Sequence, residues 1–400
     1  MDWMELRSAL KGISAYKHLM DAPVMALVQD LLDALSAGRG EEALECYTRL
    51  FYTLKKEGSR SLGSWLHDAL RYQDSPYARM VEKGPEDPVL ERAARWDIET
   101  LAALAQLECG GLTDALAGCL PEEFRRVVES LPRWESAETF SFEELTDFYR
   151  ANGSGLFARY HAFLWESGQL WPVADPDSPK PEEMLGYERQ RDQVIANTRA
   201  MLEGRLVNNV LLYGDSGTGK SATVKSLLSL PGFEDLRLIE VQKEELGDLP
   251  DLIRTLAGRR RKFILFIDDL AFDQDDRTYS ALKTILEGGL ERRPANVAIY
   301  ATSNRRHLVR QTFSDRAGDE VDAFETIQEK TSLSERFGLR IPYLALNKAD
   351  FLDMVERMAA LYGVDMDREE LRAGAVRWEM HHPGRTPRVA RQFIASLSVN

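Results

Sequence analysis

The sequence predicts an α/β fold in which helices flank a parallel sheet, with an all-helical domain before it and a small helical domain after it. Three observations support this prediction. Apolar residues recur at helical spacing over residues 1–170. Uninterrupted apolar runs alternate with helical patterns over residues 171–347, as expected for strands buried on both faces of a parallel sheet. Helical spacing then returns over residues 348–400.

The composition is typical of a globular chain. Its 400 residues exceed one small domain, and 44% of them are hydrophobic, which is enough to build cores. The formal net charge of −14 argues against a nucleic acid that binds over the whole surface. The longest apolar stretch, residues 101–120, is interrupted by polar side chains and is therefore too polar to cross a membrane.

The cysteines and the first residues bear on the cellular compartment in which the protein is expected. Residues 1–5 are acidic and lack the basic region of a signal peptide. Cys46, Cys109 and Cys119 are odd in number and have no metal-site spacing, so they are expected to be small buried residues in a reducing compartment. We therefore expect a cytoplasmic protein.

The first part of the chain is expected to be helical throughout, up to about residue 165. Gly84-Pro85 and Leu131-Pro132 separate its helices. Aromatic residues are dense near its end, and we favour a helical core that continues into the next domain over a platform that stacks a ligand. The sequence leaves open what this domain binds, and an unidentified protein partner is the expectation.

A connector and alternating elements follow. Four prolines within residues 171–181 predict an extended segment, and an amphipathic helix is expected from residue 185 to about residue 204. The remaining strands are expected over residues 210–213, 236–241, 263–267 and 297–301, and the remaining helices over residues 220–229, 246–256 and 276–290.

The most informative motif lies between the first of these strands and the helix after it. Residues 214–221 spell G-x-x-x-x-G-K-S, the pattern of a P-loop, in which backbone amides cradle phosphate oxygens. Lys220 supplies a positive charge to the β- and γ-phosphates, and the Ser221 hydroxyl is a ligand for Mg²⁺. The nucleotide-binding residues expected here are Gly214, Asp215, Ser216, Gly217, Thr218, Gly219, Lys220, Ser221 and Ala222.

Two carboxylates end a later strand. Asp268 and Asp269 follow the apolar run 263–267, and the tip of a parallel strand beside the glycine loop is where Mg²⁺ needs a second anchor. Asp268 is assigned to the metal, and Asp269 is assigned to orient and deprotonate the attacking water. The alternative for this pair is a helix cap. Because residues 236–241 form a strand between the two motifs, the Asp-Asp strand is expected to lie apart from the loop strand, with room for water.

Further polar residues extend this set. Asn304 follows the strand 297–301 and could bond both phosphate and water, and Arg305, Arg306 and His307 then resemble a charged helix start. Arg336 precedes a turn and offers a fork suited to transition-state oxygens. The alternative for Arg336 is a local ion pair with an acidic neighbour.

Two basic clusters remain. Arg385, Arg388 and Arg391 open the last helical pattern, and one of them could face the γ-phosphate; a solvated helix start is the alternative. The run 259–262 is expected in a solvated loop, with a contact to a phosphate backbone or to a neighbouring subunit as the alternative.

These motifs, in this order, resemble the AAA+ ATPase superfamily. The segments 213–221, 265–270, 300–308 and 334–339 are similar to an uncharacterised bacterial family of predicted ATP-binding proteins, and the resemblance extends back to residues 155–160. It implies an AAA+ P-loop NTPase fold and ATP hydrolysis with Mg²⁺.

The resemblance also implies roles for single residues. Arg336 becomes a finger that acts on a neighbouring subunit, which implies a homo-oligomeric ring or filament. Arg388 becomes the lid sensor, with Arg385 as the alternative. Leu185, Gly186 and Tyr187 match the segment that flanks the adenine ring.

Two departures from the superfamily bear on activity. Asp269 stands where most members have Glu, and a shorter base must be compensated by backbone position. Residues 242–247 lack the aromatic pore loop of unfoldases, which counts against that activity. The leading hypothesis is a Mg²⁺-dependent ATPase coupled to conformational change or assembly. The alternatives are a nucleotide-gated binding module with little turnover, an initiator-like or helicase-loader-like DNA-remodelling ATPase and, least favoured, a small-molecule kinase.

Overall fold

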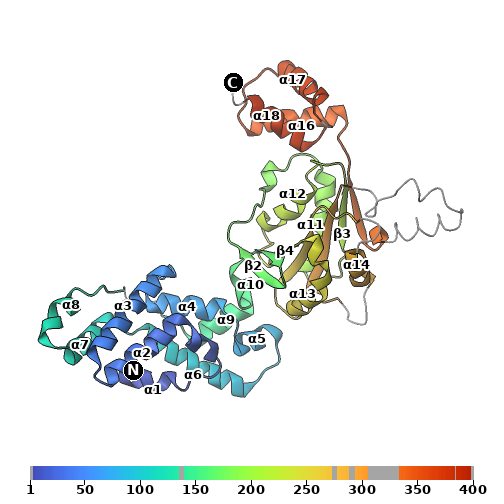
Figure 1. Ribbon diagram of the computed structural model, residues 1–400. Helices are drawn as coiled ribbons and strands as arrows, with labels where there is room; N and C mark the ends of the chain where they lie inside the picture. Colours follow the sequence, from blue (N-terminus) through green and yellow to red (C-terminus); the bar gives the residue numbers. More distant parts are fainter. Residues whose placement is uncertain are drawn as a thin grey trace. The chain divides into compact units, whose positions relative to one another are not determined.

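A computed structural model describes residues 3–134, 139–272, 277–287, 293–304, 333–382 and 384–397. The chain forms two compact units, Met1–Arg159 and Tyr160–Asn400 (Figure 1). Within the described ranges, no helix has the length and apolar character that a membrane span requires. The division into domains at residues 170 and 347 stays a prediction.

The first unit is built from helices packed around one hydrophobic core. Several helices begin at a polar cap; the Ser141 hydroxyl, for example, accepts a hydrogen bond from the Glu144 amide in a capping box. Its elements are α1 (Trp3–Leu10), η1 (Lys17–Asp21), α2 (Pro23–Ser36), α3 (Gly40–Lys56), α4 (Leu62–Tyr72), α5 (Pro76–Lys83), α6 (Pro88–Ala105), α7 (Cys109–Cys119), η2 (Glu122–Phe124), α8 (Arg125–Glu129), α9 (Phe142–Asn152) and α10 (Leu156–Arg159).

The second unit contains a seven-stranded sheet with the order β2-β1-β4-β5-β6-β3-β7. Only β1 and β2 pair antiparallel, and the other neighbours are parallel. The strands are β1 (Ala162–Glu166), β2 (Gln169–Val173), β3 (Val210–Gly214), β4 (Leu236–Val241), β5 (Lys262–Ile267), β6 (Val297–Ser303) and β7 (Leu339–Tyr343).

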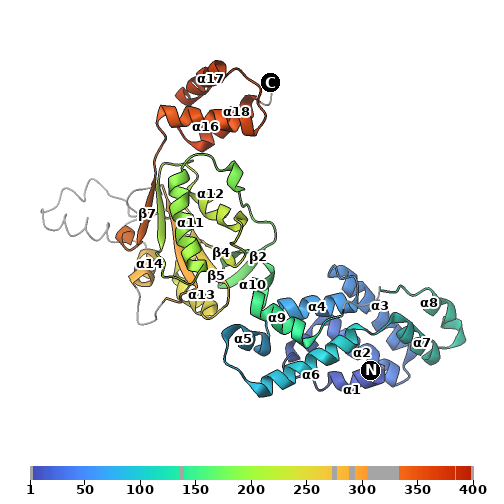
Figure 2. The ribbon, with the colours of Figure 1, turned by 180° about the vertical axis from the view of Figure 1, so that it is seen from behind.

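Helices flank this sheet (Figures 1 and 2). Residues of α11 and α12 share a buried core with one face of the sheet; Val194 and Val224, for example, belong to the same cluster as Leu212. Because side chains alternate along a strand, residues such as Leu211 and Leu265 lie on the opposite face. The elements are η3 (Pro181–Glu183), α11 (Glu188–Leu202), α12 (Lys220–Lys225), η4 (Ser226–Ser229), η5 (Lys243–Asp248), α13 (Leu249–Leu256) and α14 (Arg277–Glu287).

Three helices follow the sheet: α16 (Lys348–Leu361), α17 (Arg368–Met380) and α18 (Pro387–Leu397). They pack around a core of their own that includes Phe351 and Phe393, and we call them the lid. The predicted fold class is therefore confirmed: a mostly parallel sheet flanked by helices, with a helical N-terminal part and a helical lid.

Three strands differ from the prediction. Residues up to about 165 were expected to be helical and residues 171–181 to be a connector, but β1 and β2 form a hairpin there. Its turn is Ser167-Gly168, and both residues have positive φ (50° and 74°), which suits the twist of a two-residue hairpin. The β7 strand was not predicted, because Arg340 and Pro342 interrupt its apolar pattern; both are exposed on this edge strand.

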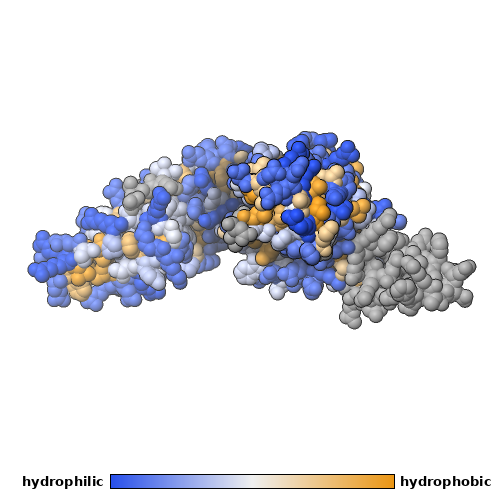
Figure 3. All heavy atoms as spheres, turned by 90° about the horizontal axis from the view of Figure 1, so that it is seen from above, coloured by the Kyte–Doolittle hydropathy of each residue, from blue (hydrophilic) through white to orange (hydrophobic). Residues whose placement is uncertain are grey.

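The surface carries the expected mixture of side chains. On the face that Figure 3 shows, hydrophilic residues dominate and hydrophobic residues lie between them in small groups. Isolated exposed apolar residues such as Leu206 are ordinary for a globular protein.

Candidate functional site

The glycine loop connects β3 to α12, and its glycines are required by geometry. Gly214 has a φ of 135°, and a Cβ there would lie 2.2 Å from the carbonyl oxygen of Tyr343. Gly219 caps α12 with a φ of 91°. Only glycine adopts such conformations readily, so the loop can turn tightly and present the first amides of α12, which have no intrahelical partners.

Lys220 is the buried cation of this loop and is only 6% exposed. Its ammonium donates to the carbonyl oxygens of Gly214 and Asp215, at 3.0 and 2.7 Å, and to Oδ1 of Asn304 at 2.9 Å. Desolvation lowers the pKa of Lys220, and the nearby carboxylates of Asp269, Asp215 and Asp268 oppose that shift. An anion in the loop would add counter-charge next to this buried ammonium and would favour its charged form further.

The Asp268 carboxylate accepts hydrogen bonds from three groups. Its Oδ1 accepts hydrogen bonds from Ser221 Oγ at 2.6 Å, from Thr302 Oγ1 at 2.5 Å and from the Asp269 amide at 3.1 Å. A hydroxyl and a carboxylate side by side are ligands that suit Mg²⁺, which binds through one or two protein oxygens together with phosphates and water. The described residues contain no cluster of three His, Cys, Asp or Glu side chains that could hold a metal ion.

Asn304 links Lys220 to the second aspartate. Its Nδ2 donates to Oδ1 of Asp269 at 2.7 Å while its Oδ1 accepts from Lys220. Asp269 itself has a φ of 49°, which is uncommon for a residue other than glycine. The sheet order explains the arrangement: β6, which leads into Asn304, lies between β3 and β5. The predicted separation of the loop strand from the Asp-Asp strand is thus confirmed, with β6 between them.

A cavity of about 680 Å³ adjoins these groups, a size suited to a nucleotide. Of the predicted residues, it is lined by Leu185, Gly186, Tyr187, Ser216, Gly217, Thr218, Gly219, Lys220, Ser221, Ala222, Asp268, Asp269, Asn304, Arg388 and Arg391. Gly214, Asp215 and Arg336 do not line it.

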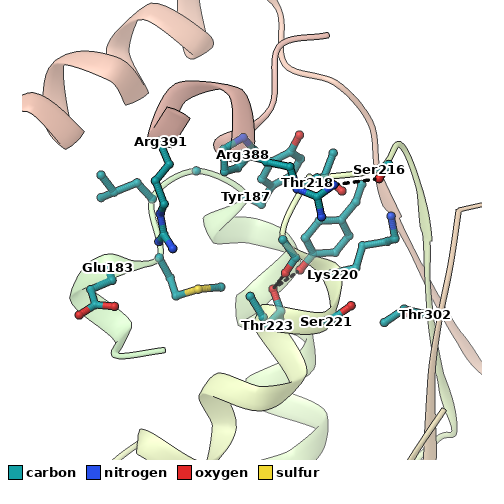
Figure 4. Close-up of a pocket in the computed structure, with 18 of the residues that line it drawn as sticks. Glu183, Tyr187, Ser216, Thr218, Lys220, Ser221, Thr223, Thr302, Arg388 and Arg391 are labelled. Atoms are coloured by element: carbon teal, nitrogen blue, oxygen red, sulfur yellow. Dashed lines mark hydrogen bonds between the residues drawn. The ribbon is translucent and has the colours of Figure 1, made fainter. Parts of the chain in front are cut away.

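Arg388 and Arg391 reach the cavity from α18 of the lid (Figure 4). The backbone amide of Arg388 donates to the Gly217 carbonyl at 3.2 Å, and its guanidinium lies 3.5 Å from Ser216 Oγ. Arg385 instead pairs with Glu379 at 3.0 Å and does not line the cavity.

Tyr187 also lines the cavity. Its ring stacks on Tyr343 with centroids 5.0 Å apart, and its hydroxyl donates to the Leu344 carbonyl at 2.6 Å. Burial raises the pKa of Tyr187. The left-handed conformations of Gly186 and Tyr187, with φ of 77° and 58°, turn the chain into α11 at this point.

The remaining sequence candidates lie elsewhere. Arg336 follows a short helical turn, its amide donating to the Leu333 carbonyl at 3.2 Å. Arg305, Arg306 and His307 fall outside the described residues. The expectation of a solvated loop for residues 259–262 is wrong for three of them. Arg259 and Arg261 are buried, Arg261 pairs with Asp235, and Lys262 begins β5.

Several residues that line the cavity were not predicted from the sequence. Thr302, Arg191 and Tyr343 belong to this group. Thr302 lies near the end of β6, two residues before Asn304, and its place at a strand tip was the signal that could have found it. Arg191 and Tyr343 come from α11 and from the unpredicted β7.

The glycine loop, the paired aspartates and the helical lid around one cavity define a P-loop fold of the AAA+ type. The chain belongs to the family described as "Protein of unknown function (DUF815)", whose model matches residues 158–400.

Among solved structures, the chain is similar to the Holliday junction branch migration motor RuvB of Thermotoga maritima, at 18% identity and a TM-score of 0.35, over 55% of this chain and 63% of that one. A variant of that RuvB gives 18% identity and a TM-score of 0.38, over 55% of this chain and 63% of that one. The matched part spans less than two thirds of those chains. No curated protein matches the chain.

Proposed function

We propose that this protein binds ATP with Mg²⁺ and hydrolyses it, and that hydrolysis is coupled to a conformational change or to assembly. One observation carries the proposal. Lys220, the Ser221–Asp268 pair and the Asn304–Asp269 pair converge at a single cavity of about 680 Å³. These are the phosphate, metal and water positions that phosphoryl transfer requires.

Binding rests on the loop and on the start of α12. The first amides of that helix and its positive dipole end attract phosphate oxygens, and Lys220 adds a full charge to them. Ser221 and Asp268 would hold Mg²⁺, which when bound neutralises charge on the β- and γ-phosphates. Arg388 contributes a second cation from the lid.

Hydrolysis is assigned to Asp269. Its carboxylate would orient the attacking water and accept a proton from it, and Asn304 fixes the carboxylate through the 2.7 Å hydrogen bond. The same amide contacts Lys220, so the position of the base is linked to the cation that binds phosphate.

Assembly and partners belong to the same proposal. Arg336 lies outside the lining of its own cavity, and we assign it to the site of a neighbouring subunit in a homo-oligomer. The helical unit Met1–Arg159 is assigned to an unidentified protein partner. The free thiols of Cys46, Cys109 and Cys119 fit a reducing, cytoplasmic setting.

Phosphate release from ATP tests the activity. Wild-type protein at high concentration is expected to release phosphate in the presence of Mg²⁺, and Lys220→Ala is expected to release none above background. Lys225→Ala is a matched control, because this lysine lies on the same helix but is directed to Glu240, 3.8 Å away. Equal release by the wild type and Lys220→Ala would reject the proposal.

A nucleotide-gated module is the second candidate, and Asp269 favours it, because a base one methylene shorter than Glu must be compensated by position. Asp269→Asn separates the two candidates. An ATPase loses turnover in this variant while it still binds ATP. A gated module binds ATP with no measurable turnover before or after the substitution.

A further inference from the structure

The Asp215 side chain of the glycine loop does not line the cavity. Asp215 was expected to contact the nucleotide, but its Oδ2 accepts a hydrogen bond from the Ala345 amide at 2.7 Å. Its own amide donates to the Tyr343 carbonyl at 2.9 Å. A carboxylate in a phosphate loop would repel a triphosphate, and this pair of hydrogen bonds directs it away from the lining residues.

The donor side of this contact is the hinge, which we define as residues 344–347 between β7 and α16. The hinge is fastened at consecutive residues. The Leu344 carbonyl accepts from Tyr187 Oη at 2.6 Å, the Ala345 amide donates to Asp215, and the Leu346 amide donates to the Arg385 carbonyl at 2.9 Å. The start of the lid is therefore tied both to the glycine loop and to the segment that precedes α18.

The end of the lid rests on the same loop. The Arg388 amide donates to the Gly217 carbonyl at 3.2 Å. The approach is close, because a Cβ on Gly217 would lie 3.0 Å from Cβ of Arg388 and 3.2 Å from Oγ1 of Thr386. The first turn of α18 thus packs directly on the loop backbone.

We propose that Asp215 is a positioning residue that latches the hinge to the phosphate loop and so fixes where the lid presents Arg388. The contacts form a closed ring: from the loop through Asp215 to Ala345, from Leu346 to Arg385, and from Arg388 back to Gly217. A change in the loop then moves both attachments of the lid together. The latch itself does not depend on the proposed function, and only its use in reporting a bound phosphate rests on that function.

Site-resolved hydrogen exchange of the full chain without nucleotide tests the latch. In the wild type the Ala345 amide is expected to exchange at least about tenfold more slowly than an unstructured amide. Asp215→Ala is expected to remove that protection and also to speed exchange at residues 385–388, because the ring is broken. Asp215→Asn is expected to keep the protection of Ala345 and the slower exchange at residues 385–388, since its amide oxygen can accept the same hydrogen bond.

Several results would overturn the latch. In the wild type, the contradicting result is an unprotected Ala345 amide. In Asp215→Ala, it is unchanged exchange, or a loss of protection at Ala345 without faster exchange at residues 385–388. An Asp215→Asn variant that exchanges like Asp215→Ala would also contradict it. The wild-type measurement decides even when Asp215→Ala fails to fold.

A second arm adds MgATP, which is expected to slow exchange at residues 385–391 in the wild type and less so in Asp215→Ala. Absence of any nucleotide effect on the wild type would count against the proposed function, while the first arm still decides the latch.

Discussion

The hydroxyl of Thr302 donates a hydrogen bond to Oδ1 of Asp268 at 2.5 Å, and it also accepts one from the Asp269 amide at 2.9 Å. Thr302 is 1% exposed and lies on β6, whereas the aspartates follow β5. A single buried hydroxyl therefore fixes both the proposed metal ligand and the backbone of the proposed base. The geometry of the aspartate pair depends on its neighbouring strand.

Replacing this hydroxyl by a methyl group should slow catalysis. Thr302→Val keeps the shape of the side chain but removes one donor to Asp268 and one acceptor for Asp269. We expect MgATP turnover to fall by about tenfold or more, since a hydrogen bond to a charged group contributes about 1.5–3 kcal/mol. Thr302→Ser retains the hydroxyl and should stay within about threefold of the wild type in the same steady-state assay. Similar rates for the Val and Ser variants would show that the hydroxyl has no such role.

The contrast between Thr302 and the loop shows what the sequence could predict. The strand, glycine loop and helix around Lys220 are adjacent in sequence, so one local pattern specifies all three. Contacts of Asp268 with Thr302 depend on the sheet order, which places β6 between β3 and β5 and which no local pattern encodes.

The missed strands have a similar cause. In β7, Leu339 and Ile341 alternate with Arg340 and Pro342, a pattern that is clear only once an edge position is known. The direction of the Asp215 side chain depended in turn on β7, because its partner Ala345 follows that strand.

Two glycines of the loop should differ in their effect on stability. In Gly214→Ala the new Cβ would meet the Tyr343 carbonyl at 2.2 Å, so we expect a loss of about 3 kcal/mol or more. In Gly219→Ala nothing lies within 4 Å, and only the left-handed backbone adds strain, about 1–2 kcal/mol. Urea unfolding of the nucleotide-free variants measures both. Equal destabilisation would mean that the packing against β7 is not as described.

Substitutions of the two lid arginines, Arg388 and Arg385, should differ in their effect on nucleotide affinity. Arg388→Ala removes the cation that reaches Ser216, and we expect MgATP affinity to fall by about tenfold. Arg385→Ala breaks only the pair with Glu379 and should remain within about twofold of the wild type. Titration calorimetry of both variants provides the comparison. A larger effect from Arg385 would reverse the assignment of the sensor.

His161, which precedes β1, should make stability depend on pH. Burial, together with the charges of Arg237 and Arg261, lowers the pKa of His161, against a smaller effect of Glu234. The unfolded chain therefore binds a proton at higher pH than the folded chain does, and stability is lost as the pH falls below about 6.5. When the pH is lowered from 7.5 to below about 6.5, the urea midpoint of His161→Gln should fall less than that of the wild type. Parallel pH profiles for the two proteins would contradict this cause.

The central claim is that the loop around Lys220 binds a nucleoside triphosphate, and titration of the full chain with MgATP measures it most directly. We expect the wild type and Lys225→Ala to bind one equivalent of nucleotide and Lys220→Ala to bind none at the same concentrations. No binding to the wild type, or equal binding to Lys220→Ala, would contradict the account.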